Sequence, residues 1–486
     1  MTHFSKTVLR NFLFTGGAQI IIKIISFTFS VLVIRRLGPE VFGQYSAILA
    51  IGAVFMIFSD LGLSPYATRQ VARLRSEENS EEHIRELYGN MLGLRIVLTF
   101  ITACMQIGTA WLTGEPMIII GAVALNCLGL FMYGIQGSTD SVLSGMERFD
   151  ISARARVGQQ ILFVILGTAA LFLHLSYYGL IGASICAILL LTIQCWHGLR
   201  SLGISPGHIQ PQKWLKLLRV SLPFGVIGFT LGLSYKFDSL LIYHFRGDSE
   251  NGLYTAAYNL IFSMAMISNV INTALYPSLS RQAAHDQSSL HHVYDRILRY
   301  LIITGLPIAV GGSILADHII LLLGGEAYRG AIDVFRILVL VSPLMFVSEY
   351  LGYIVLIRGE EKLAARSVVI STSVNVVANI LLIPRYGMMA AAVITVITEA
   401  VLMGQYASVI YGKVHFNLKN SFVAPLIAAM LMGAVTLVLR DHVPFAITIL
   451  LSACVYLPML FVFQIIGQDE MHFLRSLRTR SEVRVP

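Results

Sequence analysis

Charged residues are scarce in this chain. Asp, Glu, Lys and Arg make up only 13% of its 486 residues, whereas hydrophobic residues make up 56% and the mean hydropathy is +0.73. A typical soluble domain carries about 25% charged residues. The composition therefore argues against a soluble domain and indicates a protein that lies in a lipid bilayer.

Cysteine is also rare, and its five copies are Cys104, Cys127, Cys186, Cys195 and Cys454. All five fall inside apolar segments, and none has the CxxC spacing of a metal site. We interpret them as packing residues, and we predict no disulfide, no bound metal and no cofactor.

Long apolar runs are abundant instead. Fourteen of them approach the roughly 20 residues that a helix needs to cross a hydrocarbon core of about 30 Å. They cover approximately 11–34, 44–63, 90–111, 116–136, 157–175, 178–196, 220–245, 253–276, 298–323, 332–357, 363–383, 387–411, 421–439 and 443–466. The sequence thus predicts an all-α, polytopic membrane protein with about 14 transmembrane helices.

The positions of Lys and Arg predict the orientation in the membrane. If the N-terminus is cytoplasmic, the cytoplasmic links hold 25 of the 35 basic residues and the external links hold seven. Because cytoplasmic links carry the excess of Lys and Arg, we expect both termini in the cytoplasm. Basic links beside an anionic leaflet also account for the net charge of +8, so we expect no nucleic-acid partner.

Four short motifs recur in the same order at offsets of 208 to 214 residues. The pairs are GPEVFGQY (38–45) with GDSENGLY (247–254), PYATRQVA (65–72) with PSLSRQAA (277–284), GMER (145–148) with GEEK (359–362), and YGLIGA (178–183) with YGMMAA (386–391). Each pair occupies equivalent links. The repeat predicts two parallel six-helix bundles, residues 1–205 and 206–415, followed by residues 416–486 with a C-terminal helix pair and a basic cytoplasmic tail.

The first motif contains two glycines whose role can be predicted. Gly38 and Gly43 bracket an external link that must reverse the chain direction within about nine residues. We expect both glycines to supply backbone conformations with positive φ.

Parallel repeats favour a transporter with a central cavity between the two halves. A channel or a structural scaffold is the alternative. The sequence has neither a ring of charges nor a loop resembling a selectivity filter, which favours the transporter.

Three basic residues lie inside predicted spans. Lys23 is eleven or twelve residues from either end of its span, roughly 17 Å at 1.5 Å per residue, and its side chain is too short to reach water. It should face a water-filled cavity or an acidic partner. Lys236 poses the same problem, whereas Arg95 either lines a cavity or extends to the cytoplasmic surface. Together, Lys23, Lys236 and Arg95 would form a cationic cavity for an anionic substrate.

Three acidic residues are the counterparts of these cations. Lys236 and Asp238 are two positions apart, so they point to different sides of a helix and each needs another partner. Glu349 and Glu399 lie within spans. A carboxylate there has one of two roles: it binds a coupling ion, which is a proton or sodium, or it is the counter-ion of a lysine. Both interpretations remain open for Asp238, Glu349 and Glu399. Asp60, nearer a span end, is expected to be exposed or to cap a helix.

Four segments resemble a known family. They are RRLGPEVFGQYS (35–46), SDLGLSPYATRQVAR (59–73), GGEAYRGAIDVFRIL (324–338) and IPRYGMMAAAVIT (383–395). These segments are similar to those of the polysaccharide-export proteins of the MOP superfamily. Within it the chain most resembles the O-antigen (Wzx-type) flippases, which are relatives of the MATE exporters and of the lipid II flippase.

The resemblance implies a multi-pass protein of the bacterial inner membrane that moves a polyprenyl-diphosphate-linked oligosaccharide by alternating access. Such a protein performs no covalent chemistry and is not an enzyme. The family typically has a cationic cavity, which Lys23, Arg95 and Lys236 would fit. The implied partners are the lipid-linked oligosaccharide, membrane lipid, a coupling ion (proton or sodium), and a polysaccharide polymerase or chain-length regulator.

Three other functions are compatible with parts of the sequence. A MATE-like, cation-coupled drug exporter would need a more acidic cavity, which Asp238, Glu349 and Glu399 favour and the two lysines disfavour. A lipid II flippase would differ only in the headgroup that it carries. A membrane glycosyltransferase or polymerase commonly needs large external loops, whereas the longest external link here has about nine residues.

Overall fold

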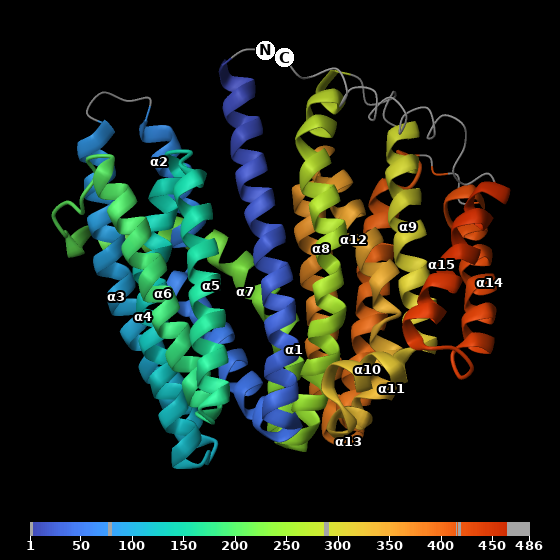
Figure 1. Ribbon diagram of the computed structural model, residues 1–486. Helices are drawn as coiled ribbons and strands as arrows, with labels where there is room; N and C mark the ends of the chain where they lie inside the picture. Colours follow the sequence, from blue (N-terminus) through green and yellow to red (C-terminus); the bar gives the residue numbers. More distant parts are fainter. Residues whose placement is uncertain (1–2, 76–79, 286–290, 415, 417–418, 464–486) are drawn as a thin grey trace, which may run out of the picture. The chain divides into compact units, whose positions relative to one another are not determined.

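The computed structural model of the protein describes residues 3–75, 80–285, 291–414, 416 and 419–463, and no strand occurs among them (Figure 1). The helices are α1 His3–Asp60, α2 Leu63–Leu74, α3 Ser80–Leu112, α4 Met117–Gly145, α5 Phe149–Phe172, α6 Ser176–Ser201, α7 Trp214–Arg246, α8 Asp248–His285, α9 His291–Ile314, α10 Ala316–Gly324, α11 Ile332–Leu338, α12 Val341–Ile357, α13 Glu361–Ile410, α14 Ala424–Leu439 and α15 Phe445–Val462. Shorter turns are η1 Pro211–Lys213, η3 Glu326–Ala331 and η4 Lys419–Val423. The predicted all-α class is confirmed.

Many of these helices can cross a membrane. Within the described ranges, nine are long and apolar enough, and a tenth span arises if Glu326–Leu338 and Val341–Ile357, which are bent by 45°, are counted together. An apolar helix satisfies its backbone hydrogen bonds internally, as a segment in lipid must. The protein is therefore a multi-pass membrane protein.

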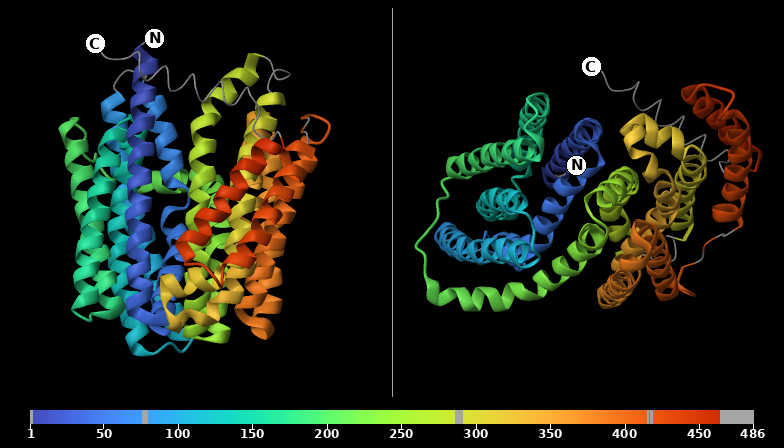
Figure 2. Two further views of the ribbon diagram at one scale, coloured as in Figure 1. Left: turned by 45° about the vertical axis from the view of Figure 1, so that its right-hand side comes forward. Right: turned by 90° about the horizontal axis from the view of Figure 1, so that it is seen from below.

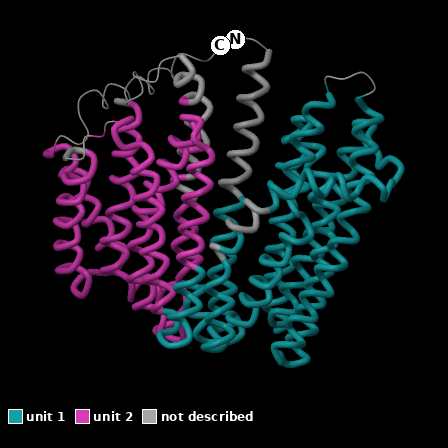
Figure 3. Tube along the Cα trace, turned by 180° about the vertical axis from the view of Figure 1, so that it is seen from behind, with its two compact units in different colours: residues 1–256, 376–388 teal, residues 257–375, 389–486 magenta. Residues whose placement is uncertain are grey.

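The chain forms two compact units (Figure 3). Unit 1 contains residues 1–256 and 376–388, and unit 2 contains residues 257–375 and 389–486. These units reflect packing, whereas the bundles 1–205 and 206–415 were inferred from repeated motifs, so the bundle boundary stays a prediction. The predicted basic tail after residue 463 lies outside the described residues.

In unit 1, helices α3, α4, α5 and α6 lie side by side, and α1 packs on α5 (Figures 1 and 2). One cluster of buried side chains contains Ile48, Val123 and Tyr177. Another contains Tyr88 and Leu143. In a bilayer such van der Waals packing, rather than burial from water, holds neighbouring helices together.

In unit 2, α9 packs against α12 and α14, and α14 pairs with α15 (Figure 1). The buried core includes Phe346, Tyr350 and Met432. The Tyr456 hydroxyl donates a hydrogen bond to the Ile303 carbonyl oxygen at 2.8 Å, which joins α15 to α9.

Each of the two repeated links, 38–45 and 247–254, begins at a glycine that interrupts the helical path. In α1 the helical path is interrupted at Gly38, where φ is 71°, and the equivalent Gly247 separates α7 from α8 with φ 89°. Glycine adopts positive φ without the steric penalty that a Cβ would impose. The conformation predicted for Gly38 is therefore confirmed, and α1 consists of two arms.

Gly43 differs from the prediction. It lies within the second arm of α1 and is not among the glycines with positive φ. A Cβ on Gly43 would collide with the Asp248 carbonyl oxygen, and a Cβ on Gly252 would collide with the Pro39 carbonyl oxygen. The expectation of positive φ at Gly43 is wrong because this glycine instead permits a close approach between the two repeated links.

Candidate functional site

A cavity of about 500 Å³ with both apolar and polar lining residues lies within unit 1. Its walls come from the end of α1, from α2, α3 and the second half of α4, and from α7 at Phe224 and Gly225. Serine, threonine, glutamine and two aspartates line it together with one arginine, Arg95. This combination gives a cavity that can hold a charged or strongly hydrogen-bonding group inside a membrane protein.

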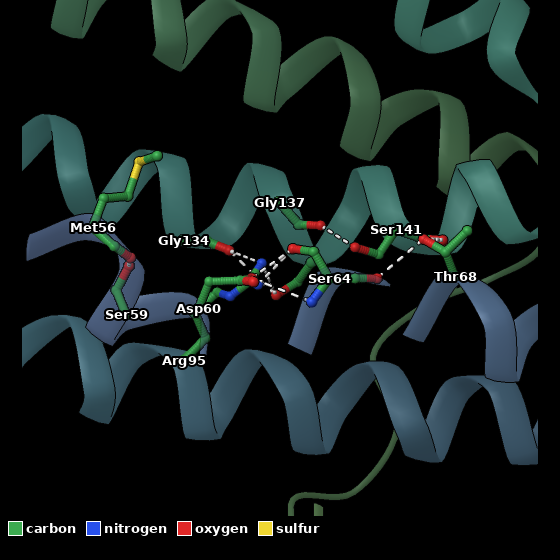
Figure 4. A network of polar contacts seen from close by, with 10 residues as sticks. Met56, Ser59, Asp60, Ser64, Thr68, Arg95, Gly134, Gly137 and Ser141 are labelled. Carbon is green, nitrogen blue, oxygen red and sulfur yellow. Dashed lines mark hydrogen bonds and ion pairs between the residues drawn. The ribbon is translucent and has the colours of Figure 1, made fainter. Parts of the chain in front are cut away.

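Arg95 on α3 is the centre of the polar network (Figure 4). Its side chain is only 3% exposed and forms an ion pair with Asp60. Nη2 donates to the Ser64 hydroxyl at 2.8 Å, and Nη1 donates at 3.3 Å to both the Gly134 carbonyl oxygen and the Ser138 hydroxyl. Of the two positions considered for Arg95, the structure shows the one in a cavity wall, and whether Arg95 contacts substrate stays a prediction.

Local sequence features create the space for this arginine. A Cβ on Gly137 of α4 would lie 2.6 Å from Arg95 Nη1, so a larger residue there would require the guanidinium to shift. Asp60 ends α1, and its Oδ1 accepts hydrogen bonds from the backbone N–H of Ser64 at 3.2 Å and from the Ser64 hydroxyl at 2.6 Å. Asp60 therefore accepts a backbone N–H from the first turn of α2, whose N-cap is Gly62, while it balances the charge of Arg95.

The Asp60–Arg95 ion pair limits what Arg95 can bind. A buried guanidinium without a counter-charge is strongly unfavourable, and Asp60 supplies that charge in this structure. Asp60 is 32% exposed and lines the cavity, so the pair can be reached from it. An anionic ligand at Nη2 of Arg95 would compete with the Asp60 carboxylate, whereas the buried Nε has no hydrogen-bond partner among the described residues.

Asp140 is a second acid in the cavity wall that the sequence interpretation missed. Its Oδ2 accepts a hydrogen bond from Arg156 Nη2 at 2.6 Å. Its Oδ1 is buried and has no hydrogen-bond partner among the described residues. The signal was the polar run GSTDS at 137–141, which continues α4 beyond the apolar run 116–136 used for prediction.

The two lysines lie elsewhere on unit 1. Lys23 is exposed on α1, and Lys236 is half-buried on α7. The Arg95 cavity as described is lined by neither of them. Asp238 is 4% exposed and accepts hydrogen bonds from the Tyr254 hydroxyl and from the backbone N–H of Ser239. Whether these residues contact substrate stays a prediction.

The remaining acidic candidates come together in unit 2. Glu349 on α12 accepts a hydrogen bond from Ser268 of α8, and Glu399 on α13 accepts one from Ser348 of α12. Ser348 directly precedes Glu349 in α12, so the hydrogen bond to Ser348 places Glu399 beside Glu349. The structure therefore groups Glu349 with Glu399 but places Asp238 in the other unit.

A family model described as polysaccharide biosynthesis protein matches residues 8–283, more than half of the chain. The chain belongs to this family. A second model, MatE, matches residues 223–381, which agrees with membership of the MOP superfamily.

Two curated relatives are similar to this member of the polysaccharide biosynthesis family. The probable low-salt glycan biosynthesis flippase Agl15 of Haloferax volcanii is 22% identical over 76% of each chain. The putative O-antigen transporter of Shigella flexneri is 22% identical over 63% of this chain and 73% of its own length.

Two solved structures have the same fold. The lipid II flippase MurJ in an inward closed conformation aligns with a TM-score of 0.78 and 14% identity, covering 93% of this chain and 98% of its own. An inward-facing MATE multidrug transporter of the MOP superfamily aligns with a TM-score of 0.61 and 13% identity, covering 86% and 96%. At such low identity these likenesses establish the fold alone.

Proposed function

We propose that the protein is a flippase that moves a polyprenyl-diphosphate-linked oligosaccharide from the cytoplasmic to the periplasmic leaflet of the bacterial inner membrane by alternating access. The observation that carries this proposal is the family match over residues 8–283, to which the glycan flippase and O-antigen transporter relatives add support. The fold shared with the lipid II flippase is compatible with the same type of movement. Transport of this kind requires no covalent catalysis.

The fold supports the finer proposal of fourteen spans. Of the nine long apolar helices found among the described residues, α1 and α13 are each broken at a glycine, Gly38 and Gly387, and would cross twice. The bent pair of Glu326–Leu338 and Val341–Ile357 would add one crossing. Helices α7 and α8 would add one crossing each, which brings the total to fourteen. The fourteen spans would then divide, as the repeated motifs predict, into two bundles of six helices and a final pair, α14 and α15.

Within this mechanism, Lys23, Lys236 and Arg95 would attract the diphosphate. An anion that leaves a negatively charged cytoplasm gains about 2.3 kcal/mol per charge at a potential of 100 mV. At Arg95 the diphosphate would displace the Asp60 carboxylate, and the two acceptors would exchange without leaving the guanidinium unpaired.

Glu349 and Glu399 are the best-supported candidates for ion coupling. Two neighbouring carboxylates in an apolar bundle repel each other unless a proton or a cation reduces their charge. Uptake and release of that proton or sodium ion would link substrate movement to an ion gradient. Asp238 would be a separate site or a counter-ion.

A polysaccharide polymerase or chain-length regulator would receive the flipped unit, and co-purification would test that contact.

The decisive experiment is to delete the gene and to locate the lipid-linked oligosaccharide. We expect it to accumulate in the cytoplasmic leaflet while surface polysaccharide disappears, and the intact gene should restore both. Lys23→Ala and Lys236→Ala at matched expression should fail to restore them. Lys413→Ala is the control, because Lys413 is an exposed cation whose partner, at 2.6 Å, is Glu360.

Other outcomes of the deletion would favour other functions. Normal surface polysaccharide with altered drug sensitivity would replace the flippase proposal with a drug exporter. Cell lysis with accumulated peptidoglycan precursor would instead indicate a lipid II flippase. In deletion cells complemented with the intact gene, flipping should stop when either the proton or the sodium gradient is dissipated, and complementation with Glu399→Gln should remove that dependence.

A further inference from the structure

A second cavity, of about 360 Å³, lies between the start of α5 and the end of α6. It shares no residue with the Arg95 cavity. Its walls carry arginines from α5 and polar side chains from α6. The proposed movement of oligosaccharide makes no use of it.

The α5 wall holds two guanidiniums on one carboxylate. Asp150 Oδ1 accepts from Arg148 Nε at 3.0 Å, and Asp150 Oδ2 accepts from Arg154 Nη2 at 3.0 Å. The arginine side chains remain 39% and 70% exposed. Two positive charges against one negative charge leave this wall with a net positive charge, and both guanidiniums have further N–H groups to donate.

The α6 wall offers polar side chains that can form hydrogen bonds. Gln194, His197 and Ser201 line the cavity at spacings of three and four residues, so they follow one face of α6. Gly198 packs against α5, where a Cβ would lie 2.6 Å from Ile151 Cγ2. This close contact brings the polar face of α6 near the arginines of α5.

The cavity lies at the ends of two helices that can span the bilayer. α5 begins at Phe149 and α6 ends at Ser201, and both helices are long and apolar enough to span the bilayer. Trp196 is 44% exposed, and the Arg200 guanidinium lies 5.3 Å from its ring centre, as in interfacial aromatic belts. Farther along the two helices, exposed Ile161 and Ile193 provide apolar surface for acyl chains.

We propose that this cavity binds the phosphate headgroup of an anionic membrane lipid. The Arg148 and Arg154 guanidiniums would donate to the phosphate oxygens, a pairing that their planar geometry suits. Gln194, His197 and Ser201 would bind the glycerol or hydroxyl part of the headgroup. Basic pockets between transmembrane helices bind such lipids. Binding here would be independent of which oligosaccharide the protein moves.

A membrane lipid fits this cavity better than a soluble phosphate does. A lipid phosphate at the membrane boundary can enter the cavity while its chains stay in contact with the exposed apolar side chains of α5 and α6. Inorganic phosphate would use only the arginine wall and would have no such contact.

The test measures lipid binding to the full-length purified protein by native mass spectrometry, with phosphatidylglycerol and phosphatidylcholine as probes. We expect a preference for phosphatidylglycerol that Arg154→Gln weakens about five-fold, the change that corresponds to roughly 1 kcal/mol for a basic residue near an anionic surface. Arg200→Gln is the matched control, because it removes the same charge from the end of α6 but lies outside the cavity. Unchanged melting temperatures would show that both variants are folded.

Two results would overturn the proposal. Equal weakening by Arg154→Gln and Arg200→Gln would mean that surface charge in general, rather than this cavity, attracts the lipid. Displacement of phosphatidylglycerol by millimolar inorganic phosphate, without a preference over phosphatidylcholine, would identify a soluble-anion site instead.

Discussion

At the scale of single residues, the Asp60–Arg95 pair shows how one acid can serve two structural purposes. Asp60 accepts hydrogen bonds from Ser64 in the first turn of α2 and also balances a guanidinium that is 3% exposed. The sequence showed that Arg95 lies inside an apolar run but left open whether it lines a cavity or extends to the cytoplasmic surface. Its partner was not predictable, because Asp60 is 35 positions away in the sequence and their contact depends on how α1 and α3 pack.

We predict that Asp60→Asn lowers the free energy of unfolding by about 3 kcal/mol, because it leaves a buried guanidinium without its counter-charge. The melting temperature in detergent should fall accordingly. Asp333→Asn is the control: its pair with Arg336 is exposed, and such pairs contribute less than about 1 kcal/mol.

The double variant Asp60→Asn with Arg95→Gln should recover part of this loss, since it removes the charge that lacks a partner. If Asp60→Asn is no more harmful than Asp333→Asn, the pair does not stabilise the fold, and Arg95 would be free to exchange partners at little cost.

At the scale of elements, the repeated links are held by reciprocal contacts. Asn251 Nδ2 donates to the Gly43 carbonyl oxygen at 2.8 Å, and Gln44 Nε2 donates to Asp248 Oδ2 at 2.6 Å. The motif match predicted that the two links are equivalent. It could not predict that they touch, because similarity between two segments carries no information about their distance.

Gly43→Ala and Gly252→Ala should each destabilise the protein by about 1 to 3 kcal/mol, because each adds a methyl group where a backbone carbonyl of the other link already lies. Thermal unfolding in detergent measures the loss. Gly108→Ala in α3 is the matched control: its Cβ would meet nothing within 4 Å, so the change should be neutral or add up to about 1 kcal/mol. Equal melting temperatures for all three variants would contradict the close approach.

At the scale of the whole molecule, hydropathy alone predicted the all-α class and the multi-pass character. Long apolar runs are a local property of the sequence, so they can be recognised without knowing how the helices pack. The cavity around Arg95 was beyond such reasoning, because it assembles residues from α1, α2, α3, α4 and α7. The glycine that makes room for Arg95, Gly137, has no distinguishing sequence context.

The predicted orientation can be tested by single-cysteine labelling in a cysteine-free background. Arg329→Cys should react with a membrane-impermeant maleimide added outside spheroplasts, and Glu81→Cys should react only after permeabilisation. Both native side chains are well exposed, at 62% and 72%, so accessibility should depend on the side of the membrane. The opposite pattern would invert the orientation that the basic residues predict.

The contact between the two links also bears on the origin of the chain. Gly43 meets Asp248 as Gly252 meets Pro39, and both pairs of equivalent residues differ by 209 positions. Such reciprocity is the mark of an isologous interface, in which one patch binds a second copy of itself. A half-length ancestor could have formed a homodimer through this glycine contact, and gene duplication with fusion would have preserved it within one polypeptide.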